Sequence, residues 1–150
     1  MAEYLANAVQ TIQLNEPAIF TASIPCNKGY IYHADETGVF ILKGITNNCF
    51  ARYQVNYDAN IALPEGATVV PIAVGITENG ELRPTSRAII TPAAAEEYQH
   101  VSGIAVITVP KGCCFQIALR AVSGVDPTGT DVPAPAILMQ NANLSITRTA

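Results

Sequence analysis

The sequence predicts a single all-β domain built as a sandwich or barrel. Short runs rich in β-branched and aromatic residues recur along all 150 residues, and each run is closed by Gly, Pro or Asn. Hydrophobic residues make up 49% of the chain and charged residues only 13%, against roughly a quarter in an average soluble domain. A chain of this length can bury a real core, so we expect residues 1–150 to form one domain.

Period-two alternation identifies half-buried strands. In Arg52–Tyr57 apolar side chains alternate with polar ones, and Cys114–Val122 follows the same pattern. The full set of predicted strands, in chain order, is Ala8–Gln13, Ala18–Ala22, Tyr30–His33, Val39–Leu42, Cys49–Tyr57, Val69–Thr77, Glu81–Leu82, Ala88–Thr91, Gly103–Val109, Cys113–Val122 and Ala136–Thr147.

Two of these segments, Val69–Ile76 and Gly103–Val109, are apolar on both faces. Such a strand must be covered twice, whereas a two-sheet sandwich covers only one face of each strand. We therefore predict that the outer face of both strands is a subunit interface, which would also cover the apolar excess of the composition. The residues assigned to this interface are Val70, Ile72, Val74, Ile76, Ile104 and Val106.

Glycine, proline and asparagine mark the turns. Asn79–Gly80 between two strands predicts a tight hairpin, because both residues accept positive φ angles. Pro64–Gly66 and Pro110–Gly112 each predict a Pro-x-Gly turn before a long apolar strand. The turn-rich stretch Ser123–Pro135 is predicted to be a long exposed loop.

One short helix is predicted near residues 92–100. Thr91 is a suitable N-cap, Pro92 fits the first helical position, and three alanines follow. At the start of the chain, residues 1–16 are a candidate anchoring segment that would meet a larger assembly.

The four cysteines, Cys26, Cys49, Cys113 and Cys114, admit two interpretations. Their spacing is not that of a zinc site, so reduced or packing roles are expected. Adjacent cysteines on a strand point to opposite faces, so a bond between Cys113 and Cys114 would be strained. If disulfides form, Cys26 or Cys49 would pair with one of these two.

The charge pattern argues against several partners. Eight basic residues are scattered singly, and the net charge is −4, so a phosphate backbone finds no concentrated basic face. No apolar run approaches the roughly 20 residues that cross a bilayer, and the first ten residues lack the features of a signal peptide. We expect neither nucleic-acid nor membrane binding, and a mature chain that begins at Met1.

No combination of residues predicts catalysis. His33 beside Asp35 and Glu36 could act on a proton or a metal, but a strand-ending surface histidine is the simpler interpretation. Glu96 and Glu97 would diverge on a helix. The 123–135 loop carries two aspartates without the dense oxygen ligands of a calcium loop. We therefore expect no enzyme activity, no cofactor and no metal.

Four segments carry a family resemblance: Met1–Gln10, Thr91–Tyr98, Val109–Cys114 and Gln140–Arg148. They resemble small structural proteins of tailed phages and prophages of gut Firmicutes, including head-decoration and head-fibre proteins. The strand order is similar to that of the TNF and C1q jelly rolls, which form trimers. The resemblance implies a jelly-roll β-sandwich and a homotrimer.

The function expected from these features is that of a non-enzymatic virion structural protein. It would be made in the host cytoplasm, decorate the capsid exterior or serve as an auxiliary head protein, and bind the major capsid protein or other virion proteins. The alternative is a C1q-like head on a virion fibre or cell surface. That head would bind a glycan or host protein through the 123–135 loop and exposed tyrosines.

Overall fold

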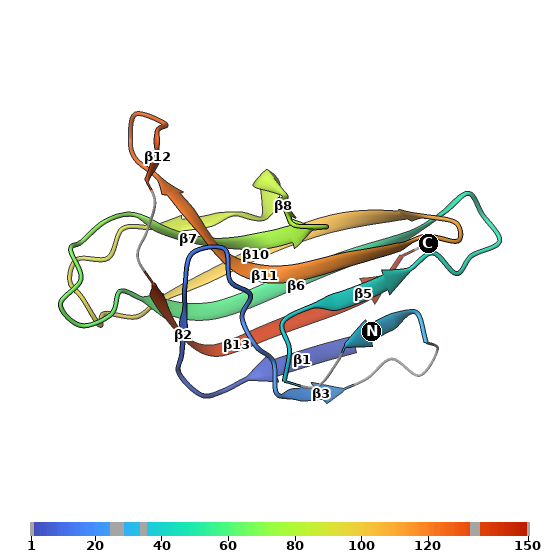
Figure 1. Ribbon diagram of the computed structural model, residues 1–150, viewed down its shortest axis with the longest axis horizontal. Helices are drawn as coiled ribbons and strands as arrows, with labels where there is room; N and C mark the ends of the chain where they lie inside the picture. Colours follow the sequence, from blue (N-terminus) through green and yellow to red (C-terminus); the bar gives the residue numbers. More distant parts are fainter. Residues whose placement is uncertain (1, 25–28, 34–35, 133–135, 150) are drawn as a thin grey trace.

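The computed structural model describes residues 2–24, 29–33, 36–132 and 136–149, and these residues fold into two antiparallel β-sheets packed face to face (Figure 1). The predicted all-β sandwich is confirmed. A single turn of 3-10 helix, η1 (Pro84–Ser86), is the one helical element among the described residues.

The first sheet has the last strand of the chain at its centre. Across the described part of this sheet, the first and last strands are neighbours because Ala2 pairs with Ile146. Strand β2 (Gln10–Ile12) pairs with the beginning of the central strand. The remaining order is β10 (Gln99–Pro110), β6 (Phe50–Ala62), β13 (Ile137–Arg148), β1 (Ala2–Ala6) and β3 (Ala22–Ile24).

The second sheet lies in front of the first in Figure 1. Strand β9 (Ala88–Ile90) pairs with one part of β7, and β12 (Asp131–Val132) pairs with the end of β11. The order of the other strands is β4 (Ile31–His33), β5 (Phe40–Lys43), β11 (Cys114–Val125), β7 (Ile72–Glu78) and β8 (Glu81–Leu82).

The core fills the space between the sheets with the inward side chains of both. In β6 the predicted alternation is confirmed, because Tyr53, Val55 and Tyr57 are buried while Arg52 is exposed. Aromatic rings close one part of the core, where the ring centroids of Tyr4 and Phe40 lie 4.5 Å apart. The largest fully buried side chains are Tyr53, Phe20, Phe40, Ile12, Leu42, Ile61, Leu63, Ile72, Ile76, Ile107, Ile117 and Leu119.

The prediction of a short helix near residues 92–100 is wrong. This segment forms an irregular corner, and its end is already the start of strand β10 at Gln99. Glu96 has a positive φ of 62°, which no α-helix tolerates, and its N–H donates to the Leu63 carbonyl at 2.8 Å. Two isolated helical turns are marginal in water, so this tertiary hydrogen bond overrides the alanine preference.

Three predicted turns are confirmed. Asn79 and Gly80 both have positive φ angles, of 51° and 89°, and form the two-residue β7–β8 hairpin. The Ala67 N–H donates to the Pro64 carbonyl, and the Cys113 N–H donates to the Pro110 carbonyl, as Pro-x-Gly turns require.

The predicted 123–135 loop is shorter than expected. Strand β11 continues to Val125 and pairs with β12, so the segment is a hairpin that projects from the sandwich (Figure 1). Asp126 organises its tip, since its carboxylate accepts hydrogen bonds from the Thr128 and Thr130 backbone N–H groups at 2.9 Å. Residues 133–135 lie outside the described residues.

The start of the chain is built into the sandwich. Ala2, Tyr4 and Ala6 point into the core from β1, a strand that the sequence analysis did not identify. The anchoring role of residues 1–16 stays a prediction. Within residues 2–16, only the side chains that point away from the core could make such an anchoring contact.

Candidate subunit interface

The six predicted interface residues occupy two different environments. Ile72, Val74 and Ile76 are fully buried in the chain's own core, so their assignment to an outer face is wrong. Val70 is partly buried against the same core. Only Ile104 and Val106, which are 47% and 44% exposed, stand on the surface.

Strand β7 is apolar on both faces because the chain itself covers both of them. Its outward residues Ala73, Gly75 and Thr77 are small or polar and buried. A Cβ on Gly75 would lie 2.6 Å from Leu82 Cδ1 of β8, so that leucine already covers this face. The Arg120 guanidinium crosses the same face, with its Nε donating to the Thr77 hydroxyl at 3.0 Å. No second subunit is needed to bury β7.

Strand β10 behaves differently, because it is the edge of the first sheet. Its inward residues are buried, while Ile104 and Val106 point outward into solvent. Phe50, paired with Pro110 at the end of the same ladder, is 37% exposed. We call the outward set Phe50, Ile104, Val106 and Pro110 the β10 strip.

Beside the β10 strip, the outward face of the first sheet is polar but poor in charge. Its middle rows carry carboxamides and hydroxyls, and most of these side chains are half-buried within the single chain. Formal charges on the outward residues of β1, β6, β10 and β13 come from Glu3, Arg52 and Asp58. Solvent-facing sheets normally carry many charges, whereas interface centres are depleted of them. The uncharged outward residues of the middle rows are Gln54, Asn56, Asn60, Asn143, Ser145 and Thr147.

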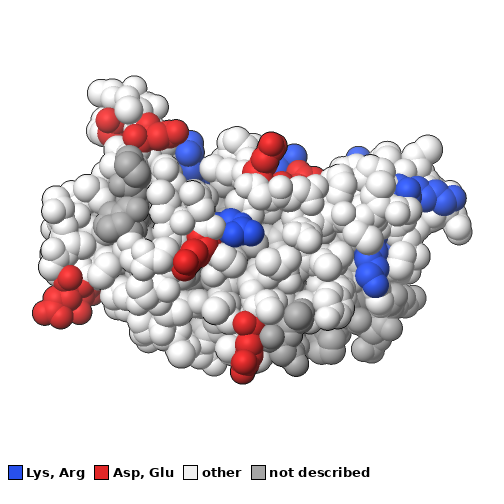
Figure 2. Space-filling view, viewed as in Figure 1, with Lys and Arg blue, Asp and Glu red and all other residues white. Residues whose placement is uncertain are grey.

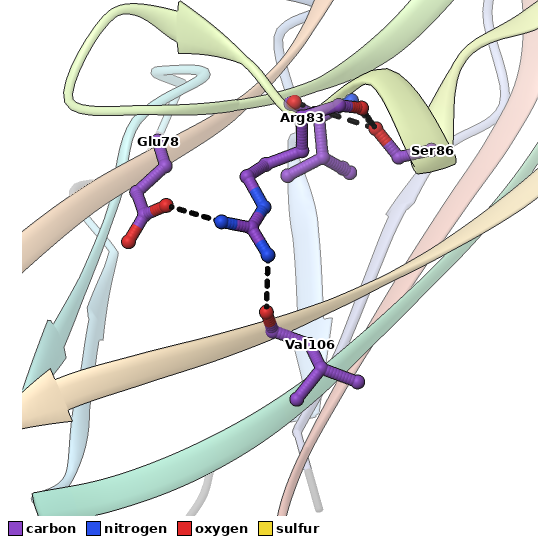
Figure 3. A network of polar contacts seen from close by, with 5 residues as sticks. Glu78, Arg83, Ser86 and Val106 are labelled. Atoms are coloured by element: carbon purple, nitrogen blue, oxygen red, sulfur yellow. Dashed lines mark hydrogen bonds and ion pairs between the residues drawn. The ribbon is translucent and has the colours of Figure 1, made fainter.

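A polar network fixes the free edge of β10 to the second sheet (Figure 3). Arg83 Nη1 pairs with Glu78 Oε2 at 3.2 Å, and its Nη2 donates to the Val106 carbonyl at 3.2 Å. The Ser86 hydroxyl donates to the Arg83 carbonyl at 2.7 Å and accepts the Ile76 N–H at 2.9 Å. These contacts hold the strand that carries the exposed pair in one position.

Tyr57 fastens the same edge from inside the core. Its hydroxyl donates to the Ser86 carbonyl, and burial raises the pKa of this hydroxyl above its ordinary value. Gly103 of β10 lies directly against this contact, because a Cβ there would be 2.5 Å from Tyr57 Cε1 and 2.6 Å from the Ser86 oxygen. Only glycine lets β10 approach this closely.

The structure does not bring together the residues considered as candidates for catalysis or metal binding. His33 stacks on Phe40 with centroids 4.4 Å apart, and its Nε2 lies 2.7 Å from the Thr37 carbonyl. No group of three or more His, Cys, Asp or Glu residues among those described could hold a metal ion. In the projecting hairpin, the Thr128 hydroxyl and nearby backbone N–H groups lower the pKa of Asp126. These contacts order a turn and do not create a proton-transfer site.

Three of the four cysteines are free and exposed thiols: Cys49, Cys113 and Cys114. They do not pack in the core, so of the two expected roles these three have that of reduced thiols and not that of packing residues. Cys26 lies outside the described residues. In the described part of the chain, no helix is long and apolar enough to span a bilayer.

The amide-rich face and Phe50 were missed by the sequence analysis. The signal was present in Gln54, Asn56, Asp58 and Asn60, which occupy every second position of one strand. Polar residues at every second position of a strand normally indicate a face in contact with water. In this strand only the small number of charged residues indicates an interface instead.

No protein-family model and no curated protein matches this sequence. Solved structures do match. The globular domain of the zebrafish complement 1qA protein aligns over 99% of this chain and 97% of its own length, with a TM-score of 0.59 and 17% identity. The fold is the C1q/TNF-type jelly roll.

Two further solved structures are similar at lower TM-scores. The C-terminal domain of the sugar-binding protein EclA aligns over 95% of this chain and 80% of its own length, with a TM-score of 0.41 and 17% identity. Rabbit GITRL aligns over 95% of this chain and 93% of its own length, with a TM-score of 0.42 and 12% identity. The expected C1q/TNF-like jelly roll is confirmed by the zebrafish domain.

Proposed function

We propose that this C1q/TNF-like domain is a non-enzymatic structural protein that assembles as a homotrimer through the outward face of its first sheet. The observation that carries the proposal is the charge-poor face beside the β10 strip, where Ile104 and Val106 are each almost half exposed. Covering this apolar edge gives association its driving force, and the carboxamides give it hydrogen bonds.

The face supplies a substantial part of the area that such an assembly buries. Strands β6, β10 and β13 have 13, 12 and 12 residues, so each is about 40 Å long at a rise of about 3.3 Å per residue. Three strands at a spacing of about 4.8 Å give an area of roughly 600 Å². A stable interface takes about 800 Å² from each partner, and each subunit of a cyclic trimer has two neighbours, so this face supplies more than a third of the area that one subunit would bury.

The biological setting we propose is the exterior of a virion. Support comes from the four segments that resemble structural proteins of tailed phages, and the compact jelly roll suits a capsid decoration or auxiliary head protein. The protein would be made in the host cytoplasm, and its partners would be the major capsid protein or other virion proteins.

Two measurements test the proposal. Sedimentation equilibrium of the recombinant chain at micromolar concentration is expected to give three times 15.9 kDa. A stable monomer would refute the trimer. In micrographs of virions released after prophage induction, gold-labelled antibody against the chain is expected to bind the capsids. Label found only on tails, or only on material without virions, would refute the head location.

A receptor-binding or glycan-binding head is the second candidate function. The projecting β11–β12 hairpin favours it, because a tip held by Asp126 is exposed and ordered in advance of any contact. Replacing residues 126–130 with a two-residue Asn-Gly turn should abolish binding on a glycan array. Binding that survives this replacement would exclude the hairpin as the receptor site.

A further inference from the structure

A polar cavity lies at the end of the sandwich where the chain crosses from β5 to β6. It has a volume of about 410 Å³, within the range of small-molecule sites. The β5–β6 loop forms one wall, and the second wall comes from Tyr30 and from Arg148 near the end of β13. Its six lining residues are Tyr30, Ile45, Thr46, Asn47, Asn48 and Arg148.

The geometry points to a binding site for an acidic sugar, one that carries a carboxylate on a hydroxyl-bearing ring. This site goes beyond the structural function proposed above and lies apart from the projecting hairpin. Each part of such a sugar finds a matching group among the lining residues.

Arg148 supplies the positive charge for the carboxylate. Its guanidinium carbon lies 4.1 Å from the centroid of the Tyr30 ring, so the side chain is held by stacking on an aromatic face. The Tyr30 backbone is itself fixed, because its carbonyl accepts the Lys43 N–H at 2.9 Å. An arginine side chain stays protonated at every physiological pH, so this fixed positive charge attracts a carboxylate that enters the cavity.

The β5–β6 loop supplies groups for the hydroxyls of a sugar. Asn47 and Asn48 are exposed, and each carboxamide offers two N–H donors and an acceptor oxygen. The Asn48 backbone N–H donates to the Thr46 hydroxyl at 3.1 Å, which gives the loop a defined turn. Ile45 is 51% exposed and offers an apolar contact to the C–H face of a ring.

The charge around the cavity favours an anion, although the whole chain is acidic. The six lining residues include no carboxylate. Lys43 precedes the loop, and Lys111 lies in the turn whose next residue, Gly112, donates to the Gly44 carbonyl at 3.0 Å. At the right-hand end of Figure 2, where these loops lie, the visible charged side chains are all basic.

Direct binding of monosaccharides to the full chain tests this site. Glucuronate and N-acetylneuraminate are titrated against isotope-labelled protein in NMR experiments, with glucose as the neutral probe and inorganic phosphate as the simple anion. We expect both acidic sugars to bind with a dissociation constant on the order of 1 mM, and to shift the side-chain amide signals of Asn47 and Asn48. Glucose and phosphate should bind at least about tenfold more weakly.

Two variants and one control separate the contributions. Arg148→Gln should remove the preference for acidic over neutral sugars, and its melting curve shows whether the fold survives loss of the Tyr30 stack. Asn47→Ala alters only an exposed loop residue and should weaken both acidic sugars by about tenfold. Asn7→Ala changes another exposed asparagine, between β1 and β2, and should leave binding unchanged.

Three outcomes would overturn the site. The first is that neither acidic sugar shifts the amide signals of the loop. The second is that phosphate binds as well as the sugars, which would reduce the cavity to a general anion site. The third is that Asn47→Ala and Asn7→Ala bind the acidic sugars equally. None of these results depends on the oligomeric state, which sedimentation measures separately.

Discussion

Replacing Ile104 with lysine tests whether the β10 strip holds subunits together. Ile104 is 47% exposed in the single chain, so a neighbouring subunit can bury about half of its side chain. Full burial of such a side chain contributes about 1.5–3 kcal/mol, so each copy contributes about 1 kcal/mol. A lysine charge confined in the interface costs at least about 1 kcal/mol more.

Three copies of Ile104→Lys should therefore weaken the trimer by about 6 kcal/mol, or about four orders of magnitude in its association constant. Folding of the subunit should change little, because exposed substitutions usually alter stability by less than about 0.5 kcal/mol. Sedimentation equilibrium measures association, and far-UV circular dichroism checks the fold.

Ile89→Lys is the matched control for this experiment. Ile89 is 42% exposed, but it lies on β9 of the second sheet. We expect the Ile89→Lys protein to remain trimeric. The β10 strip does not hold the subunits together if Ile104→Lys sediments like the wild type or if both variants dissociate equally. Ile104 is not an independent surface residue if Ile104→Lys unfolds the subunit.

The remaining predictions concern the contacts of Tyr57 and Gly103 at the edge strand β10, and the tip of the projecting hairpin. Tyr57→Phe leaves the buried Ser86 carbonyl without its donor and should cost about 1–3 kcal/mol in urea unfolding. Because burial raises the pKa of Tyr57, the wild type should lose stability as the pH rises above the ordinary tyrosine pKa of about 10. The Tyr57→Phe variant should lose less stability over the same alkaline range. Equal slopes of unfolding free energy against pH for the two proteins would contradict this. Gly103→Ala places a Cβ 2.6 Å from the Ser86 oxygen and should destabilise by about 1–3 kcal/mol, measured by the same unfolding curves. Thr128→Val removes a hydrogen bond to the Asp126 carboxylate, so NMR titration should show the pKa of Asp126 rising toward its ordinary value. An unchanged pKa would show that backbone N–H groups alone depress it.

The sequence predicted those parts of the fold that are determined locally. The alternation in Arg52–Tyr57 gave a half-buried strand, and Asn79–Gly80 gave a hairpin, because each depends on the residues themselves. The corner around Glu96 was predicted as a helix, since the hydrogen bond to Leu63 that overrides it comes from a distant segment.

The interface was predicted only in part for the same reason. Ile72 and Ile104 look alike in sequence, but Ile72 points into the core, whereas Ile104 points outward from an edge strand. The outer face of β7 is covered by Leu82 and Arg120. The arginine that covers Thr77 lies far from it along the chain, so no local pattern could indicate the cover. The cavity beside Tyr30 likewise joins three separate segments and has no sequence motif.

The central position of β13 has a consequence for how the protein is made. This strand pairs with β1, β2 and β6, and it follows all three of them along the chain. Until it emerges, β1 and β6 expose the edges that it will occupy, and such distant pairings form slowly. The first sheet is therefore completed only after β13 has been made. Subunits that associate through this sheet must meet after β13 is in place, and neighbours on one messenger RNA cannot assemble through it before that.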